Sequence, residues 1–174
     1  MGPKVIMEYG QRPPKCRDKN PIGPNSTLFV HFSASDGSGI DKAGEPKQAV
    51  RNIQAFHMGP ERGWCDIGYS YVLVQQRGIF KRPLLFKGRG FHAVPASQEG
   101  HNTGNMSVCV IADSNDRIKR STVAALAWLA RRCPARTVKG HRDVGSTDCP
   151  GDHLYSKVPS LNQAAKLSKR AFLP

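Results

Sequence analysis

The sequence contains no long apolar run. No segment of its 174 residues comes near the roughly eighteen uninterrupted apolar residues that a membrane-spanning helix needs. The N-terminal stretch MGPKVIMEYGQRPPKC also lacks the apolar segment of about 7–15 residues found in secretory signal peptides. We therefore expect no membrane insertion. We also expect the protein to be made in the cytoplasm without an export signal.

Acidic residues are scarce. Asp and Glu number 13 against 26 for Lys and Arg, which gives a net charge of +13 and an isoelectric point near 9.9. This excess predicts attraction to a polyanion, and nucleic acid, an anionic membrane and a bacterial cell wall all qualify. The basic residues are scattered, without a compact run, an aromatic stacking array or a nucleic-acid motif. We therefore expect an anionic partner surface and no nucleic acid.

The five cysteines include no CxxC pair. Their odd number and spacing indicate neither a zinc ribbon nor a complete disulfide framework. Cys109 lies in an apolar run and Cys133 ends a helical pattern, so both are expected to be buried thiols. Cys16 and Cys65 could pair, but nothing in the sequence fixes the distance between them.

The length predicts a single domain. The proline-rich segment 1–27 has little periodicity and is expected to be an irregular arm that precedes a catalytic domain over 28–174. Within the domain, β-favouring runs predict strands over 28–33, 69–76, 79–86, 106–113 and 137–139. Helical spacing of apolar residues predicts helices over 46–58, from 121 to the residue before Pro134, and over 160–170.

Strands and helices are intermingled along the chain, so the expected fold class is mixed α/β, with a central mixed sheet and helices on both faces. The segment 87–105 has no period and many turn-forming residues. Long loops in compact domains are usually functional, and we expect this one to form a wall of a cleft at one edge of the sheet.

The most informative stretch is GHRDVGSTDCPGDHLY, from Gly140 to Tyr155. Its His141 and Cys149 cannot share a helix face, so a common ligand would need a strand end followed by a folded-back loop. Imidazole and thiolate both suit zinc, and two histidines with one cysteine would leave a fourth position open for water, as in catalytic sites. Taken alone, these residues are more often a surface imidazole and a buried thiol.

Four segments resemble, in order, the blocks of the type 2 N-acetylmuramoyl-L-alanine amidases: VHFSA, GWCDIGYSYVL, the stretch from KGRGFHAVPAS to GHNTGNMSVCVI, and GHRDVGSTDCPGDHLY. That family includes peptidoglycan recognition proteins and lysozyme-like phage amidases. The resemblance, from about Leu28 to Tyr155, implies a zinc hydrolase of the amide bond between N-acetylmuramic acid and L-alanine of the stem peptide. It makes Zn²⁺ the expected cofactor and peptidoglycan, both glycan strand and stem peptide, the expected partner.

By motif, the resemblance implies His31, His141 and Cys149 as the zinc ligands. It implies that Tyr69 in DIGYSY orients the attacking water or donates a hydrogen bond to the oxyanion. Thr147 stands where many phage members carry lysine, and a threonine hydroxyl would offer a weaker, neutral hydrogen bond there.

Three further residues, Trp64, Arg89 and His101, are expected to contact the substrate, although an exposed arginine is otherwise usually just solvated. We expect Arg142 and Asp143 to pair locally. The remaining histidines, His57, His92 and His153, are expected to be ordinary polar or helix-packing residues.

Two other functions stay open. A binding module of the same fold would recognise peptidoglycan without cutting it, and loss of the cysteine ligand would be its expected signature. Alternatively, Cys149 could act as a nucleophile with His141 as its base, as in a thiol peptidase. The charge of +13 would hold a monomeric enzyme at an anionic cell wall. Together with the missing export signal, the resemblance suggests the catalytic domain of a phage endolysin, made in the bacterial cytoplasm and acting at the wall.

Overall fold

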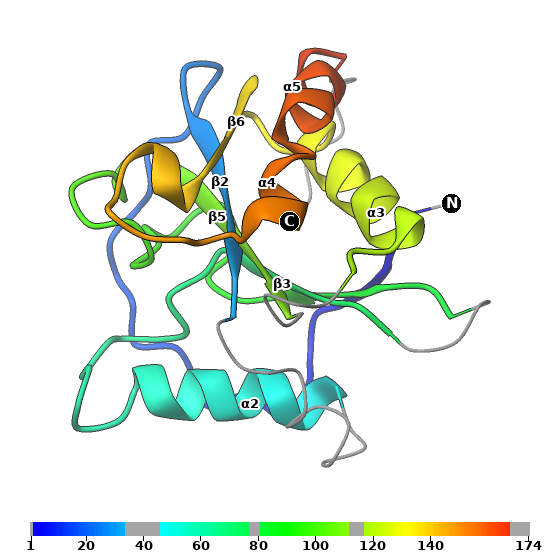
Figure 1. Ribbon diagram of the computed structural model, residues 1–174. Helices are drawn as coiled ribbons and strands as arrows, with labels where there is room; N and C mark the ends of the chain where they lie inside the picture. Colours follow the sequence, from blue (N-terminus) through cyan, green and yellow to red (C-terminus); the bar gives the residue numbers. More distant parts are fainter. Residues whose placement is uncertain (1, 34–45, 77–80, 112–116, 168–174) are drawn as a thin grey trace.

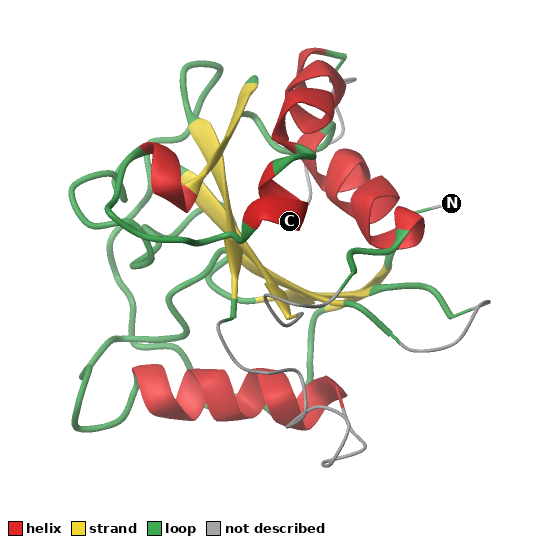
Figure 2. Ribbon diagram, in the orientation of Figure 1, coloured by secondary structure: helices red, strands yellow, loops and turns green. Residues whose placement is uncertain are grey.

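The computed structural model describes residues 2–33, 46–76, 81–111 and 117–167. In this part of the chain, a six-stranded sheet lies between helices on both of its faces (Figure 1, Figure 2). The predicted fold class, a mixed α/β domain around a central mixed sheet, is confirmed. None of the described helices is both long and apolar enough to cross a membrane.

The strands are β1 (Lys4–Ile6), β2 (Thr27–Phe32), β3 (Tyr71–Val74), β4 (Leu84–Lys87), β5 (Met106–Ile111) and β6 (Thr137–Gly140). Their order in the sheet is β1-β4-β3-β5-β2-β6. The pair β3 and β4 is antiparallel, and the other neighbouring strands run parallel. Every residue of β5 is buried, as expected for a continuous apolar run in a strand that is covered on both faces.

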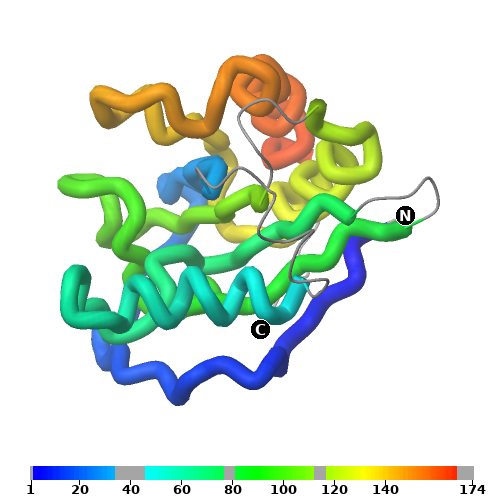
Figure 3. Tube along the Cα trace, turned by 60° about the horizontal axis from the view of Figure 1, so that its bottom comes forward, coloured from blue at the N-terminus to red at the C-terminus, as the bar shows by residue number. Residues whose placement is uncertain are grey.

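The helices are α2 (Pro46–His57), α3 (Arg120–Ala130), α4 (Asp152–Tyr155) and α5 (Val158–Lys166), with a short 3₁₀ helix η1 (His141–Asp143). In Figure 1, α2 lies below the sheet, whereas α3 and α5 lie above it. The segment between β1 and β2 passes beside α2 (Figure 3). There the Gln54 side chain accepts a hydrogen bond from Arg12 N and donates one to Arg12 O.

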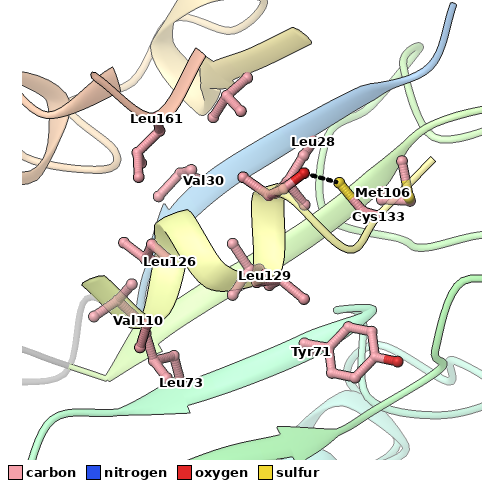
Figure 4. Close-up of a cluster of buried hydrophobic side chains, with 14 of the residues drawn as sticks. Leu28, Val30, Tyr71, Leu73, Met106, Val110, Leu126, Leu129, Cys133 and Leu161 are labelled. Atoms are coloured by element: carbon pink, nitrogen blue, oxygen red, sulfur yellow. Dashed lines mark hydrogen bonds between the residues drawn. The ribbon is translucent and has the colours of Figure 1, made fainter. Parts of the chain in front are cut away.

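Each face of the sheet carries its own hydrophobic cluster. On one face, Leu126 and Leu129 of α3 pack with Val30 of β2 and Val110 of β5 (Figure 4). On the other face, strand residues pack against Val50 of α2. Because side chains alternate along a strand, the residue after Val30 points away from α3 and toward the α2 side of the sheet.

Several element boundaries differ from the sequence predictions. Residues 4–6 of the expected irregular arm form β1, which pairs with β4 at the sheet edge. The helix predicted from residue 121 begins one residue earlier, as α3 at Arg120. At its start, Gln75 Oε1 accepts hydrogen bonds from Lys119 N and the Thr122 hydroxyl.

Two predicted strands also change their extent. Strand β3 begins only at Tyr71, which leaves Tyr69 in the preceding loop. Strand β4 begins at Leu84. The ends expected at 79–80, 112–113 and 168–170 lie outside the described residues.

A disulfide joins Cys16 to Cys65, with their Cα atoms 4.9 Å apart. It ties the segment between β1 and β2 to the loop that leads into β3. A backbone hydrogen bond of 2.9 Å from Lys15 N to Cys65 O strengthens the same attachment. The sequence left this pairing open, and the structure shows it formed.

The outer edge of β6 is covered by side chains. Asn162 of α5 accepts a hydrogen bond of 2.6 Å from Val138 N and donates one of 2.8 Å to Val138 O. Two residues further along the strand, Gly140 N donates to Asp143 Oδ2 at 2.8 Å. Val138 N, Val138 O and Gly140 N, on the side of β6 away from β2, therefore have partners.

Candidate metal and catalytic site

The two predicted histidine ligands lie at the carboxyl ends of two adjacent parallel strands. Val30 of β2 is paired with Gly140 of β6 in the sheet register. The residue after each of these is a histidine, the first still within β2 and the second at the start of η1. The rings of His31 and His141 lie 4.6 Å apart between centroids. The carboxyl ends of parallel strands meet at one edge of a sheet, which is where such folds place their sites.

The third predicted ligand arrives on the loop that returns after η1. Arg142 N donates to Cys149 O at 2.9 Å, which closes this loop. Cys149 Sγ accepts a hydrogen bond from Phe32 N at 3.4 Å and lies 3.7 Å from His31 Nδ1. The ligand atoms of His31, His141 and Cys149 all lie within 4.8 Å of one another.

A local network holds the loop in this shape. Besides binding Gly140 N, the Asp143 carboxylate accepts the Tyr155 hydroxyl at 2.5 Å. Arg142 pairs with Asp152 at 2.7 Å and lies over the Tyr155 ring, so the expected pairing of Arg142 with Asp143 is replaced by two separate interactions. Gly140 is required by close approach, because a Cβ there would lie 2.7 Å from the Tyr155 ring.

Burial sets the protonation of the three ligands. It lowers the pKa of His31 to about 3, helped by the nearby His141, and it lowers the pKa of His141 as well. Burial also raises the pKa of the Cys149 thiol to about 11, partly opposed by the Phe32 N–H and by Arg142. Near neutral pH the cluster therefore holds two neutral imidazoles and a thiol, which loses its proton when a metal ion binds.

Tyr69 lies beside this cluster. Its ring is 5.5 Å from that of His31 and 5.7 Å from that of His57, between centroids. Burial, followed by the proximity of Cys109 and Cys149, raises its pKa well above the ordinary value. The side chain therefore keeps its proton and remains a hydrogen-bond donor.

No protein-family profile matches the chain. It is 33% identical over 163 residues to peptidoglycan recognition protein 1 of Mus musculus, and the match covers 88% of this chain and 84% of the mouse protein. The chain belongs to the peptidoglycan recognition protein family.

Other relatives and solved structures agree. The chain is 28% identical over 158 residues to the N-acetylmuramoyl-L-alanine amidase of Homo sapiens, and 27% identical over 161 residues to peptidoglycan-recognition protein LB of Drosophila melanogaster. These matches cover 84% and 88% of this chain, but only 26% of the human protein and 66% of the fly protein. The structure of wild-type Drosophila PGRP-LB superposes with a TM-score of 0.71 at 25% identity, covering 90% of this chain and 93% of that chain.

In this family member, Thr147 lies within the ligand loop. Its side chain is exposed, and Oγ1 accepts a hydrogen bond of 3.1 Å from Cys149 N. The hydroxyl thus supports the turn that presents the thiol, while its own hydrogen is free to donate elsewhere. Its role toward an oxyanion stays a prediction.

Trp64 and His101 lie on different segments around the cluster. Trp64 is half-buried, its ring lies 4.6 Å from that of His57, and the Arg62 guanidinium lies 5.3 Å from it. His101 is exposed, and its ring lies 6.4 Å from that of Phe29 in β2. Both positions are accessible, and their contact with substrate stays a prediction.

Arg89 has a structural role that the sequence did not indicate. Its guanidinium donates to the backbone oxygens of Ile67 at 2.7 Å, Val94 at 2.6 Å and Asp66 at 3.2 Å. These bonds join the segment after β4 to the loop that carries Tyr69. Since they hold all three nitrogens of the guanidinium, we do not include Arg89 among the proposed substrate contacts.

Two residues near the cluster were not assigned to it from the sequence. His57, expected to be a helix-packing residue, is indeed buried on α2, and its Nδ1 accepts Gly68 N at 3.0 Å behind Tyr69. Gln98 contacts His31 directly, with Oε1 3.2 Å from Nε2. No sequence pattern marks Gln98, because it lies in an aperiodic loop 67 residues from its partner.

Proposed function

We propose that this protein is a zinc-dependent N-acetylmuramoyl-L-alanine amidase that acts on bacterial peptidoglycan. The observation that carries the proposal is the group formed by His31, His141 and Cys149, whose ligand atoms lie within 4.8 Å of one another. Relatives named as amidases support the chemistry. A related fly protein in complex with tracheal cytotoxin, and a human one in complex with a muramyl pentapeptide, support the substrate class.

The residues present fit a zinc ion. Zinc–nitrogen and zinc–sulfur bonds of about 2.0–2.3 Å in a tetrahedron put neighbouring ligand atoms roughly 3.3–3.8 Å apart. The 3.7 Å between Cys149 Sγ and His31 Nδ1 falls in this range. Two imidazoles and one thiolate are a suitable donor set, and such an ion supplies Lewis acidity that activates water and polarises a carbonyl.

The hydrolysis adds water to the lactyl carbonyl carbon and breaks the bond to nitrogen, so that the amine of L-alanine leaves with an added proton. Negative charge develops on the carbonyl oxygen during this step. The Tyr69 hydroxyl, held in its protonated form beside His31, donates a hydrogen bond to that oxygen or to the attacking water. Thr147 adds a second, neutral donor from the ligand loop.

The thiol peptidase alternative is disfavoured by electrostatics. A cysteine nucleophile needs a lowered pKa, whereas burial raises that of Cys149 to about 11. His141 also has its pKa lowered by burial, so it does not supply a stabilising positive charge near neutral pH. These pKa shifts therefore favour Cys149 as a metal ligand over Cys149 as a nucleophile.

A recognition module without activity is the second candidate, because the relatives include proteins named for recognition as well as amidases. The presence of Cys149 in the cluster favours the enzyme. In either case we propose that the charge of +13 adds attraction to the anionic wall and that the protein acts there as a monomer. The relatives reported above are animal proteins, and the phage origin expected from the sequence stays a prediction.

The test is digestion of purified peptidoglycan, with the products separated and weighed by mass spectrometry. We expect stem peptides with a free N-terminal alanine, together with about one zinc ion per chain by elemental analysis. A strong chelator should abolish release, and added Zn²⁺ should restore it. Binding without release would favour the recognition module, whereas release that survives chelation but not thiol alkylation would favour the peptidase.

A further inference from the structure

Gln98 reaches the proposed metal site from the loop between β4 and β5. Its side chain is 1% exposed and that of its partner His31 is 2% exposed, so the contact between them is shielded from water. Gln98 Oε1 lies 3.2 Å from His31 Nε2. The Ser97 hydroxyl donates to the same Oε1 at 2.6 Å.

The orientation of the Gln98 amide follows from its other partner. The amide nitrogen of Gln98 donates to the backbone oxygen of His101 at 3.3 Å. The reversed amide would set two oxygens against each other at that position and lose this bond. The atom that faces His31 Nε2 is therefore the amide oxygen, which can only accept.

An acceptor at this position fixes the tautomer of His31. Nε2 must carry the hydrogen, so Nδ1 keeps its lone pair. Nδ1 is the ring nitrogen that faces Cys149 Sγ at 3.7 Å. Gln98 and Cys149 thus lie at the two nitrogens of the same imidazole.

We propose that Gln98 is a positioning residue that holds His31 in the Nε2–H form and presents Nδ1 to a metal ion shared with His141 and Cys149. The inference rests on the proposed metal site. A hydrogen-bond acceptor behind a histidine ligand fixes the ring orientation and raises its basicity, and its loss typically weakens metal binding by about 10–100-fold.

The backbone around Gln98 makes it suitable for this role. The Asn102 side-chain oxygen accepts hydrogen bonds from Ser97 N at 3.0 Å and from Gln98 N at 3.1 Å. His101 N also donates to Gln98 O at 3.0 Å, so the loop closes on itself. The amide is therefore held at its position by the loop as well as by its own hydrogen bonds.

Nitrogen-15 NMR of the metal-free protein tests the proposal, with the His31 signals assigned by their loss in His31→Gln. We expect the Nε2–H tautomer in the wild-type protein. Gln98→Met keeps a chain of similar length without the acceptor, so this preference should weaken and the dissociation constant for Zn²⁺ should rise at least about 10-fold. Gln54→Met is the matched control, because Gln54 is a buried glutamine that bonds Asp66 and Arg12 but no proposed ligand.

The control should keep both the wild-type tautomer and the wild-type zinc affinity. An Nδ1–H tautomer in the wild-type protein would overturn the proposal, whether or not the variants fold. A folded Gln98→Met protein with unchanged tautomer and zinc affinity would also overturn it. If the wild-type protein bound no zinc, the proposed function would fail, while the tautomer measurement would still decide the role of Gln98.

Discussion

Among single residues, the three proposed ligands are uncharged near neutral pH, with His31 and Cys149 buried and His141 half-buried. His31 is almost fully buried and its pKa is lowered to about 3, while the pKa of the Cys149 thiol is raised to about 11. A neutral imidazole binds a metal without losing a proton, whereas the thiol must release one. Cys149 is therefore the ligand whose replacement removes the negative charge of the site.

Replacing Cys149 with alanine should abolish zinc binding and amide cleavage while the fold is kept, because within the described part of the chain the thiol accepts a single backbone hydrogen bond, from Phe32 N. Zinc content, muropeptide release and a thermal melt measure the three properties. Cys133→Ala is the control, since this buried thiol bonds Ala130 O in the opposite cluster and its loss should lower stability but not zinc content. A Cys149→Ala protein with full zinc and full turnover would rule out the ligand role.

Tyr69→Phe should lower turnover by about 100-fold, the usual effect of removing one donor to an oxyanion. The zinc content should be unchanged, because the hydroxyl is proposed to act on substrate or water. Tyr71→Phe is the comparison, since Tyr71 lies in the hydrophobic cluster on the α3 side of the sheet. A fall in zinc occupancy in Tyr69→Phe would make the hydroxyl a ligand instead.

At the level of elements, the site depends on two connections outside the strands. The ligand loop brings Cys149 back to β2, and the segment after β4 supports the loop that carries Tyr69. Gly88 N donates to Ser70 O and Arg89 N to Tyr69 O, each at 3.0 Å. The second connection therefore sets where the Tyr69 backbone lies.

Gly88→Ala should disturb that connection. A Cβ at this position would lie 2.3 Å from Tyr69 O and 2.9 Å from Ile67 Cγ2, so the backbone must move. We expect a loss of about 1–3 kcal/mol in the free energy of unfolding, together with reduced turnover at full zinc content. Gly23→Ala, where nothing lies within 4 Å of the added atom, should leave both unchanged, and equal behaviour of the two variants would contradict this role of Gly88.

The disulfide between Cys16 and Cys65 also restrains the loop that leads into β3, because it ties this loop to the segment between β1 and β2. Cys16 and Cys65 are 49 residues apart in the sequence, so the crosslink removes much freedom from the unfolded chain. The double variant Cys16→Ser, Cys65→Ser should lose about 2–4 kcal/mol in urea denaturation and keep its zinc. Identical denaturation midpoints for the variant and the oxidised wild-type protein would show that the crosslink adds nothing.

Elements with strong local patterns could be predicted from the sequence. The start of β5 at Met106 was predicted, and both ends of the periodic α2 were predicted to within one residue. Strand β1 has only three residues and pairs at an edge, which gives little pattern to detect. At the start of α3, Gln75, a residue far away in the sequence, accepts the hydrogen bond of Lys119 N, which no local pattern predicts.

In the candidate site, too, some residues could be predicted from the sequence and others could not. The motifs pointed to His31, His141, Cys149 and Tyr69, and the structure brings these side chains together. Gln98 could not be predicted, because its partner lies on another element and its own loop has no period. The bonds of Arg89 likewise depend on distances that only the folded chain defines.

For the whole molecule, burial of histidines makes stability depend on pH. Burial, with the charges of Arg62 and Arg89, lowers the pKa of His57 to about 4 from an ordinary value of 6.5. The unfolded chain therefore binds more protons than the folded one, so this stability is present above pH 6.5 and is lost as the pH falls toward 4. His31 acts in the same direction, down to a pKa of about 3.

Denaturation of the chelated protein should therefore show unfolding free energies that fall between pH 6.5 and 4.5, by up to about 1.4 kcal/mol per pH unit for each group. His57→Gln should make this decline shallower. His92→Gln, at an exposed position, should leave it unchanged. A stability that is flat over this pH range in the wild-type protein would contradict the burial argument.

The covered edge of β6 affects whether copies of this protein associate through their sheets at high concentration. Asn162 and Asp143 occupy the backbone groups of Val138 and Gly140 that an incoming strand would need. A neighbouring molecule cannot add a strand there without first displacing both side chains. This border of the sheet therefore resists the edge-to-edge association from which β-rich aggregates grow.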